Sequence, residues 1–244
     1  MDWGSFPLRG MFFDENENLS GLKGVFMVKI KCIVSDICEE NGYVVWKDGA
    51  KECVLIDPGF SAGRFLDFMA SEDLTNVAAI FCTHGHADHI GGINALRERF
   101  PEAKIVIGKK DADKLTDSKK NLARHFGINI VFPPADLKLS EAQTELEFAG
   151  VKFTAFQTPG HSAGHVVYLL KVDEGQIPVV FAGDLIFYGS VGRTDFFDGN
   201  PKALVESIQN VIFSLSDETE LFTGHGPATT VGVERRTNPY VREG

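Results

Sequence analysis

The segment 83–92, with the sequence THGHADHIGG, constrains the fold of this chain more than any other feature. Within six positions it holds four side chains able to bind a metal ion, His84, His86, Asp88 and His89. Ligands on one helix face would be spaced by three or four residues, so this spacing predicts a loop that wraps around an ion. The alternative without metal is a polar loop before a helix, with Asp88 as its N-cap.

Further candidate ligands each lie beside a glycine after a strand-like run: His161, His165, Asp184 and His225. Strand ends joined by glycine-rich turns deliver side chains to one edge of a sheet. Asp184 follows a fully apolar run, and burying its carboxylate there would be costly unless it were paired or bound to a cation. We therefore predict that His161, Asp184 and His225 join the motif. His165 is interpreted as a structural hydrogen-bonding residue, and His125 as a surface helix residue.

The hydrophobic pattern predicts alternating helices and strands first, and successive strands later. Strands are expected at 28–34, 43–46, 53–56, 77–82, 104–107, 146–148, 151–157, 166–171, 179–182 and 220–223. Helices are expected at 62–69, at 92–100, in a polar region through about residue 125, and at 201–214. This order predicts two sheets packed face to face with helices outside, in one domain over residues 27–244. Residues 1–26 are expected to form an extension of unknown role.

Composition excludes several classes of function. The net charge of -10, with Lys and Arg spread along the chain, argues against nucleic acid and makes any arginine near the site a candidate anion contact. No apolar run approaches the roughly 20 residues of a membrane span. The acidic residues within positions 1–26 argue against a secretory peptide. We expect a cytoplasmic protein whose thiols are reduced and buried, Cys32, Cys38, Cys53 and Cys82, because they form no Cys-x-x-Cys pair.

Five blocks together resemble the metallo-β-lactamase superfamily from about residue 27 to the end: LIDPG at 55–59, THGHADHIGG, TPGHS at 158–162, GD at 183–184 and GHGP at 224–227. The resemblance implies an α/β fold, a four-layer αβ/βα sandwich of two mixed sheets. It also implies a binuclear site in which one metal is held by His84, His86 and His161, the other by Asp88, His89 and His225, and both by Asp184. For Asp57 it implies a role in holding the ligand loop, beside the plain interpretation of a turn residue.

Within that superfamily the chain looks most like short bacterial members of the glyoxalase II group, the hydroxyacylglutathione hydrolases. The matching segments are 158–168, 192–199 and 223–240. Arg193 stands where larger members carry a glutathione-contacting lysine, and it is the expected substrate contact. The tyrosine that follows in those members is replaced by Phe196 and Phe197, and only a short segment follows His225. Arg235 and Arg236 are candidates to replace contacts from the C-terminal helical domain of the larger members.

Imidazole and carboxylate ligands suit two divalent ions, Zn²⁺ first, with Fe or Mn also accommodated. Two ions sharing one water lower its pKa toward about 7, which provides a hydroxide to attack a thioester carbonyl. Asp88 and Asp184 are expected to orient it, which makes them catalytic residues as well as ligands. A thiolate, whose conjugate acid has a pKa near about 8.5, leaves with little proton assistance. The expected partner is a small thioester such as S-lactoylglutathione, and the oligomeric state is left open.

A persulfide dioxygenase is the main alternative, because such iron enzymes share the Gly-Arg-Thr-Asp-Phe run at 192–196. It would use a facial triad of two histidines and one carboxylate, here His84, His161 and Asp184. The GHGP block around His225 favours the hydrolases. Other esterase, lactonase or phosphodiesterase activities, and a metal-binding module without catalysis, are further alternatives. Asp184 in place of a cysteine argues against the zinc β-lactamases.

Overall fold

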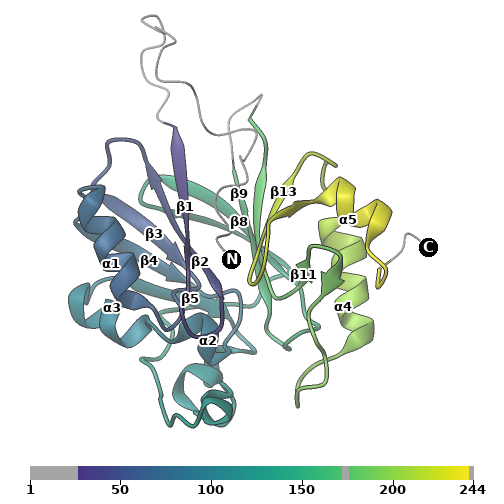
Figure 1. Cartoon of the computed structure of the whole chain (residues 1–244), viewed down its shortest axis with the longest axis horizontal. Coiled ribbons are helices and arrows are strands. Elements are labelled where there is room, and N and C mark those ends of the chain that lie inside the picture. The colour runs from purple at the N-terminus through teal and green to yellow at the C-terminus, as the bar shows by residue number, and fades with distance from the viewer. Residues whose placement is uncertain (1–26, 172–175, 242–244) are drawn as a thin grey trace, which may run out of the picture.

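Two mixed sheets pack face to face between helices in the computed structural model, which describes residues 27–171 and 176–241 (Figure 1). The first sheet has the order β1-β2-β3-β4-β5-β6, with strands Val28–Val34, Asn41–Lys47, Glu52–Ile56, Asn76–Phe81, Lys104–Gly108 and Leu137–Leu139. The second has the order β14-β13-β10-β9-β8-β7; in chain order its strands are Gln143–Phe148 (β7), Val151–Gln157 (β8), Val166–Leu170 (β9), Val179–Gly183 (β10), Glu220–Thr223 (β13) and Thr229–Thr230 (β14). Ile186–Phe187 (β11) and Ser190–Val191 (β12) form a small hairpin.

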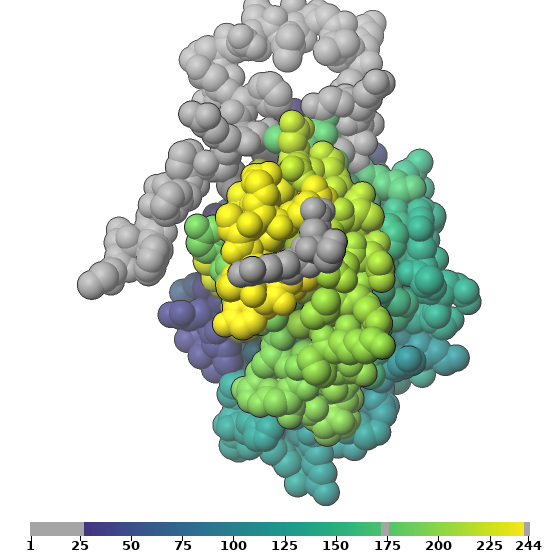
Figure 2. Space-filling model, turned by 90° about the vertical axis from the view of Figure 1, so that its right-hand side faces the viewer, coloured from purple at the N-terminus to yellow at the C-terminus, as the bar shows by residue number. Residues whose placement is uncertain are grey.

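Helices cover the outer face of each sheet. The first sheet is covered by α1 (Ala62–Ser71) and α3 (Ile93–Arg99), which follows the one-turn helix α2 (Ala87–Ile90). The second is covered by α4 (Pro201–Ser207), its π-helical continuation η3 (Ile208–Ile212) and α5 (Val231–Thr237). Figure 2 shows α4 and α5 side by side on that face. The expected four-layer αβ/βα sandwich is therefore confirmed.

Strand alternation explains why three apolar layers form. In β3, Cys53 and Leu55 pack beneath α1 and α3, whereas Val54 and Ile56 point to the layer between the sheets. Successive side chains of a strand point to opposite faces, so a strand that is buried on both sides reads as a continuous apolar run. The third layer lies between the second sheet and α4, where Leu204 packs. No helix in the described residues has the length and apolar character that crossing a membrane requires.

The structure differs from the sequence prediction in its irregular helices. The polar region through residue 125 contains two short 3-10 helices, η1 (Ala112–Thr116) and η2 (Ala123–Phe126), in place of a regular α-helix. The helix expected at 201–214 is α-helical only to Ser207, after which η3 continues as a π-helix. The predicted extension, residues 1–26, lies outside the described residues.

The cysteines differ in burial. Cys53 and Cys82 are buried and Cys38 is half-buried, whereas Cys32 in β1 is exposed. The expectation that Cys32 lies in the core is wrong: it shares the inner face of the edge strand β1 with Val28 and Ile30, but burial on that face decreases toward the end of the strand. All four thiols are free.

Candidate metal centre

Strand ends deliver the candidate ligands to one edge of the sandwich. His84 and His86 follow β4, and Asp57 follows the neighbouring parallel strand β3. Asp184 follows β10, and His225 follows β13, which runs parallel to β10. The carboxyl ends of parallel strands lie at the same edge, so each sheet brings its own side chains to the cleft between them.

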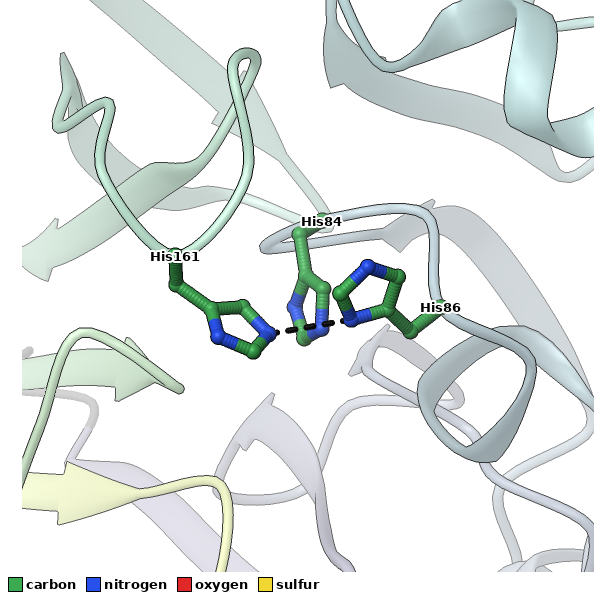
Figure 3. Close-up of side chains that lie close together, drawn as sticks. All are labelled: His84, His86 and His161. Carbon is green, nitrogen blue, oxygen red and sulfur yellow. Dashed lines mark hydrogen bonds between the residues drawn. The ribbon is translucent and has the colours of Figure 1, made fainter. Parts of the chain in front are cut away.

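His84, His86 and His161 form one cluster (Figure 3). One ligand atom from each lies within 4.8 Å of the others, and His161 Nε2 is 2.9 Å from His86 Nδ1. All three side chains are buried. His161 lies 75 positions after His86 in the sequence, yet the fold places the two side chains beside each other.

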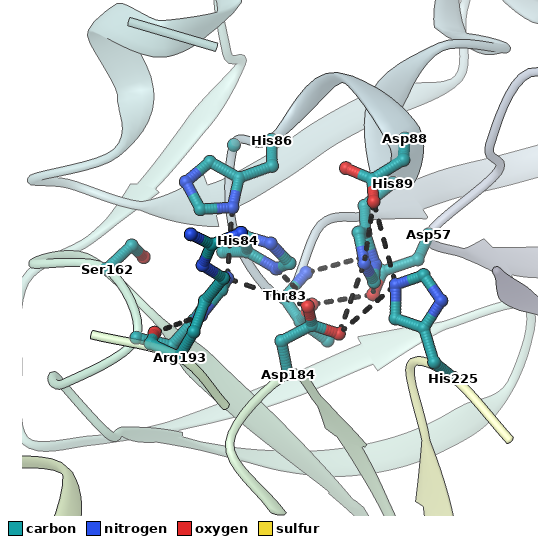
Figure 4. A network of polar contacts seen from close by, with 12 residues as sticks. Asp57, Thr83, His84, His86, Asp88, His89, Ser162, Asp184, Arg193 and His225 are labelled. Atoms are coloured by element: carbon teal, nitrogen blue, oxygen red, sulfur yellow. Dashed lines mark hydrogen bonds and ion pairs between the residues drawn. The ribbon is translucent and has the colours of Figure 1, made fainter. Parts of the chain in front are cut away.

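Asp88, His89 and His225 form the second cluster, again with ligand atoms within 4.8 Å of one another. His225 Nε2 lies 3.6 Å from Asp88 Oδ2. Asp184 lies between the clusters: its Oδ1 is 3.2 Å from His89 Nε2 and its Oδ2 is 3.6 Å from His161 Nε2. Figure 4 shows Asp184 reaching toward His89 and His225. All seven predicted ligands therefore come together, in the two predicted groups.

Unpartnered buried atoms fit a divalent cation at this centre. His84 Nε2 and His86 Nε2 are buried without a hydrogen-bond partner among the described residues. Buried polar atoms are rarely left in that state because desolvation is costly. Imidazole nitrogens and carboxylate oxygens are also the donor set that zinc and similar ions prefer. The site residues thus fit a metal cofactor.

Hydrogen bonds made by Nδ1 fix the ring orientation of His161 and His84, so that Nε2 of each ring faces the centre. His161 Nδ1 donates to the carbonyl oxygen of Arg193 at 2.8 Å. The Thr83 hydroxyl donates to Asp57 Oδ2 at 2.6 Å, so it accepts from His84 Nδ1 at 3.1 Å. With Nδ1 protonated, Nε2 of each ring carries the lone pair that a metal needs.

Asp57 anchors the motif from below. Its Oδ2 accepts from His89 Nδ1 at 3.0 Å, and its Oδ1 accepts from the Thr83 backbone N–H at 2.7 Å. Asp57 has a φ of 45°, an uncommon backbone conformation that holds the carboxylate under the ligand loop. Of the two interpretations of this residue, the geometry supports the holding role.

Asp88 does not cap a helix. His86 occupies the N-cap position of α2, while Asp88 lies in the first turn and His89 in the last. The prediction of a wrapped loop is therefore correct for His84 and His86 and wrong for Asp88 and His89, which lie on one short helical turn. The two side chains nevertheless meet His225, with the ligand atoms of the three residues within 4.8 Å of one another.

Glycine 183 lets β10 approach the motif. Its φ is 48°, and the register of β10 against β13 shifts between Phe181 and Gly183. A Cβ at this position would lie 2.3 Å from Thr83 Oγ1. Only glycine adopts this conformation at such short range without strain, and the resulting bend directs Asp184 between the two clusters.

The side chains of the centre shift one another's pKa values in opposite directions. Burial alone would raise the pKa of Asp184, but the facing imidazole of His89 holds it well below its usual value. Burial opposes protonation of His89, yet the carboxylates of Asp184 and Asp88 raise its pKa well above 6.5. Burial, reinforced by neighbouring imidazoles, lowers the pKa of His84 and His86 well below 6.5. Those two rings are neutral at pH 7, the state that binds a cation.

We expect the metal-free protein to lose stability as the pH falls below about 6.5. Burial lowers the pKa of His165 well below 6.5, as it does for His84 and His86. Below about pH 6.5 these histidines bind protons in the unfolded chain but stay neutral in the folded protein. The free energy of unfolding that they contribute is therefore fully present above the pKa of an unfolded histidine and decreases as the pH falls, by up to about 1.4 kcal/mol per pH unit for each group.

Urea titrations of chelator-treated protein across this pH range measure the effect. The raised pKa values of His89 and His225 act in the opposite direction, so His165→Gln isolates one contribution. The variant should decline less steeply than wild type toward acid pH. Equal slopes for the two proteins would contradict the assignment.

His165 has the structural role predicted for it. Its Nδ1 lies 2.9 Å from the Thr158 hydroxyl, and its buried ring stacks on His84 with centroids 5.4 Å apart. It belongs to neither ligand cluster.

A cavity of about 480 Å³ opens above the centre. It is lined by residues of the centre, His86, Asp88, His161, Asp184 and His225, and by a rim of Leu122, His125, Phe126, Arg193 and Phe196. Arg193 lies on this rim, as predicted, with its guanidinium 4.5 Å from the Phe196 ring centroid and paired with Asp195. His125 is exposed, as expected, but it lies in η2 and contributes to the rim, a role the sequence did not indicate.

Arg235 and Arg236 do not line this cavity. Both pair with Asp217, and Arg235 also donates to the carbonyl oxygens of Phe213 and Leu215. The expectation that they supply substrate contacts is wrong for this cavity, because both are held by Asp217 and Arg235 is also bound to the end of η3.

Comparisons of the sequence and of the structure with known proteins point to the same family. The model of the Metallo-beta-lactamase superfamily matches residues 36–227. Hydroxyacylglutathione hydrolase GloC of Haemophilus influenzae is 33% identical over 216 residues, which cover 88% of this chain and 98% of GloC. The crystal structure of BLEG-1 B3 metallo-beta-lactamase has a TM-score of 0.80 at 36% identity, covering 87% of this chain and 99% of that one. TTHA1623 in a di-iron-bound form has a TM-score of 0.73 at 36% identity, covering 86% and 100%.

Proposed function

The chain belongs to the metallo-β-lactamase superfamily, and on that premise we propose that it is a metal-dependent hydrolase of small thioesters, of the hydroxyacylglutathione class. The observation that carries the proposal is the juxtaposition of two complete ligand clusters with an open cavity. His84, His86 and His161 lie beside Asp88, His89 and His225, with Asp184 between them. The similarity to GloC over nearly its whole length supports the thioester as substrate.

Two divalent ions are proposed as cofactors: His84, His86 and His161 would hold one, Asp88, His89 and His225 would hold the other, and Asp184 lies between the two clusters. Zinc suits the nitrogen and oxygen donors, and iron or manganese is compatible with the same set. The similarity to a chain described in a di-iron-bound form supports occupancy by two ions and makes iron a candidate to test. When bound, the ions would supply hydroxide at neutral pH and would polarise the substrate carbonyl group.

Asp88 and Asp184 are proposed to orient the attacking water. Both carboxylates line the cavity, and the low pKa of each keeps it ionised and able to accept a hydrogen bond. Burial works against ionisation in both, and the facing imidazoles, His89 first, overcome it. A thiolate leaving group needs little proton assistance, which suits a site whose two central carboxylates are ionised and have no proton to donate.

Arg193 and Phe196 are proposed to bind the thiol part of the substrate. Arg193 is largely exposed and carries five donors in a planar fork suited to a carboxylate. Its ion pair with Asp195 is also exposed, so the arginine can exchange that partner at little cost. His125 on the facing part of the rim offers a second polar contact.

Replacing Arg193 should weaken substrate binding without stopping the reaction. We expect Arg193→Ala to raise KM about tenfold and to leave kcat within about twofold, because a rim contact acts on the bound substrate and not on the reacting atoms. Steady-state kinetics measures both. Arg99→Ala is a matched control, since Arg99 is also an exposed arginine over a phenylalanine ring, at 5.3 Å from the Phe100 centroid. An unchanged KM for Arg193→Ala would remove this residue from the substrate site.

One set of assays tests the reaction class. Protein purified without added metal is analysed for metal content, then assayed for S-lactoylglutathione hydrolysis, O₂ uptake with glutathione persulfide, and β-lactam hydrolysis. The proposal expects thioester hydrolysis to exceed the other two. O₂ uptake with one iron per chain would identify a dioxygenase and overturn it. The β-lactam arm is needed because a chain described as a B3 metallo-beta-lactamase is 36% identical, so Asp184 alone does not exclude that activity.

A further inference from the structure

A buried lysine lies behind the ligand loops, where it contacts none of the proposed ligands. Lys114 of η1 has a side chain only 1% exposed. Its Nζ lies 3.1 Å from Asp111 Oδ2 and 2.8 Å from Asp198 Oδ2. Burying an ammonium group is costly unless it is paired and hydrogen-bonded, so this three-residue network needs a reason.

Asp111 joins the two loops that carry the first cluster. Its Oδ2 accepts from the backbone N–H of Gly85, between His84 and His86, at 2.9 Å. The same carboxylate accepts from the Ser162 hydroxyl at 2.8 Å and from the Gly164 N–H at 2.7 Å. One buried side chain therefore fixes the His84–His86 loop against the loop that follows His161.

Asp198 extends the network to the substrate-facing loop, residues 192–199. Its Oδ2 accepts from Lys114 and from the Ala163 N–H at 3.1 Å. The same loop carries Arg193 and Phe196, and the Arg193 carbonyl accepts from His161. Lys114 thus connects the ligand loops with the loop that forms the cavity rim.

Close packing leaves this connection little freedom. A Cβ at position 85 would lie 2.7 Å from Lys114 Cβ, and one at position 164 would lie 2.3 Å from the Asp111 backbone nitrogen. Gly85 and Gly164 therefore allow the two ligand loops to approach η1 closely. Displacing Lys114 or Asp111 must shift the ligand loops.

We propose that the Asp111–Lys114–Asp198 network positions two things at once: the first metal cluster through Asp111, and the rim loop 192–199 through Asp198. These are positioning residues, since none contacts the proposed substrate or belongs to a ligand cluster. The rim part rests on the proposed function, whereas the metal part does not. Replacing Asp111 should therefore weaken metal binding, whereas replacing Asp198 should loosen the rim loop 192–199.

Zn²⁺ competition with a chromogenic chelator tests the metal part on the full chain. We expect Asp111→Asn to weaken Zn²⁺ binding about tenfold or more, because its amide group cannot accept from all the donors that the carboxylate serves. Ser162→Ala removes one of those hydrogen bonds and should weaken binding in the same direction, which keeps the test decisive if Asp111→Asn does not fold. Asp113→Asn is the matched control, two positions away in the same segment, where the carboxylate pairs with Lys120 in solvent.

Amide hydrogen exchange of the zinc-loaded chain tests the rim part. Asp198→Asn should increase exchange in residues 192–199 about tenfold while leaving Zn²⁺ affinity within about twofold. Lys114→Met should show both defects. With an active substrate, Asp198→Asn should raise KM more than it lowers kcat.

Two results would overturn the inference. One is Zn²⁺ affinity in folded Asp111→Asn and in Ser162→Ala equal to that of Asp113→Asn. The other is unchanged exchange of residues 192–199 in both Asp198→Asn and Lys114→Met. Neither measurement needs turnover, so absence of thioester hydrolysis would count against the proposed function alone.

Discussion

Asp184→Asn is expected to lower kcat/KM about a thousandfold or more. Asp184 uses one oxygen toward His89 and His225 and the other toward His161. An amide retains one oxygen and presents an NH₂ group to the other side, so it cannot serve both clusters and carries no negative charge. Bound metal should fall at the same time, because the side chain between the two clusters is the one replaced.

Steady-state kinetics and metal analysis on the same preparation measure this effect. Asp48→Asn, which alters an exposed carboxylate paired with Lys29, is the control for a general effect of removing one negative charge. Circular dichroism confirms that Asp184→Asn is folded. Retention of full metal content with near wild-type activity would show that the two clusters act independently of this carboxylate.

Removal of metal is expected to abolish hydrolysis and to lower the melting temperature. Without ions, the buried Nε2 atoms of His84 and His86 keep no hydrogen-bond partner among the described residues. A ligand at a thousand times its Kd stabilises the folded state by about 4 kcal/mol, so the thermal shift should be large. Dialysis against a chelator, followed by activity assays and calorimetry, measures both quantities.

Restoration by added metal separates specific loading from damage. Zn²⁺, Fe²⁺ and Mn²⁺ are returned singly to the stripped protein, and each should restore activity to a different extent. Mg²⁺ is the control, because it prefers oxygen ligands and octahedral geometry and should restore little. Full activity in stripped protein, verified by metal analysis, would contradict a metal-dependent reaction.

Regular elements of this fold are accessible from the sequence alone. The bounds of β1, β8 and β13 agree with those expected, because each run combines β-branched or aromatic residues with clear flanking breaks. The two-sheet order also follows from the pattern, since helices and strands alternate from α1 to β6, whereas β7 to β12 follow one another without a helix. Helix α5 was missed because Val231–Thr237 contains glycine, valine and threonine, which are weak helix formers. Tertiary contacts and the Thr230 N-cap stabilise it instead.

The candidate site likewise has parts that the sequence predicts and parts that it does not. Side chains with a characteristic chemistry and spacing, such as His84 and His86, can be recognised in the sequence. The Arg193 carbonyl that holds His161 leaves no signal, because every residue has such a group. The partnership of Lys114 with Asp198 also has none, since the two lie 84 positions apart and neither has a distinctive neighbour. Long-range ion pairs of this kind depend on the packing of loops, which local patterns do not encode.

The division of the ligands between two sheets has a consequence for the newborn chain. The motif at 83–92 is synthesised early, with β4, but His225 follows β13 near the other end. A ribosome must therefore release almost the whole protein before both clusters exist. Metal would therefore be captured late, by side chains that come from both sheets. Cut between β6 and β7, the chain would give fragments that each hold part of the site, and zinc should promote their reassembly.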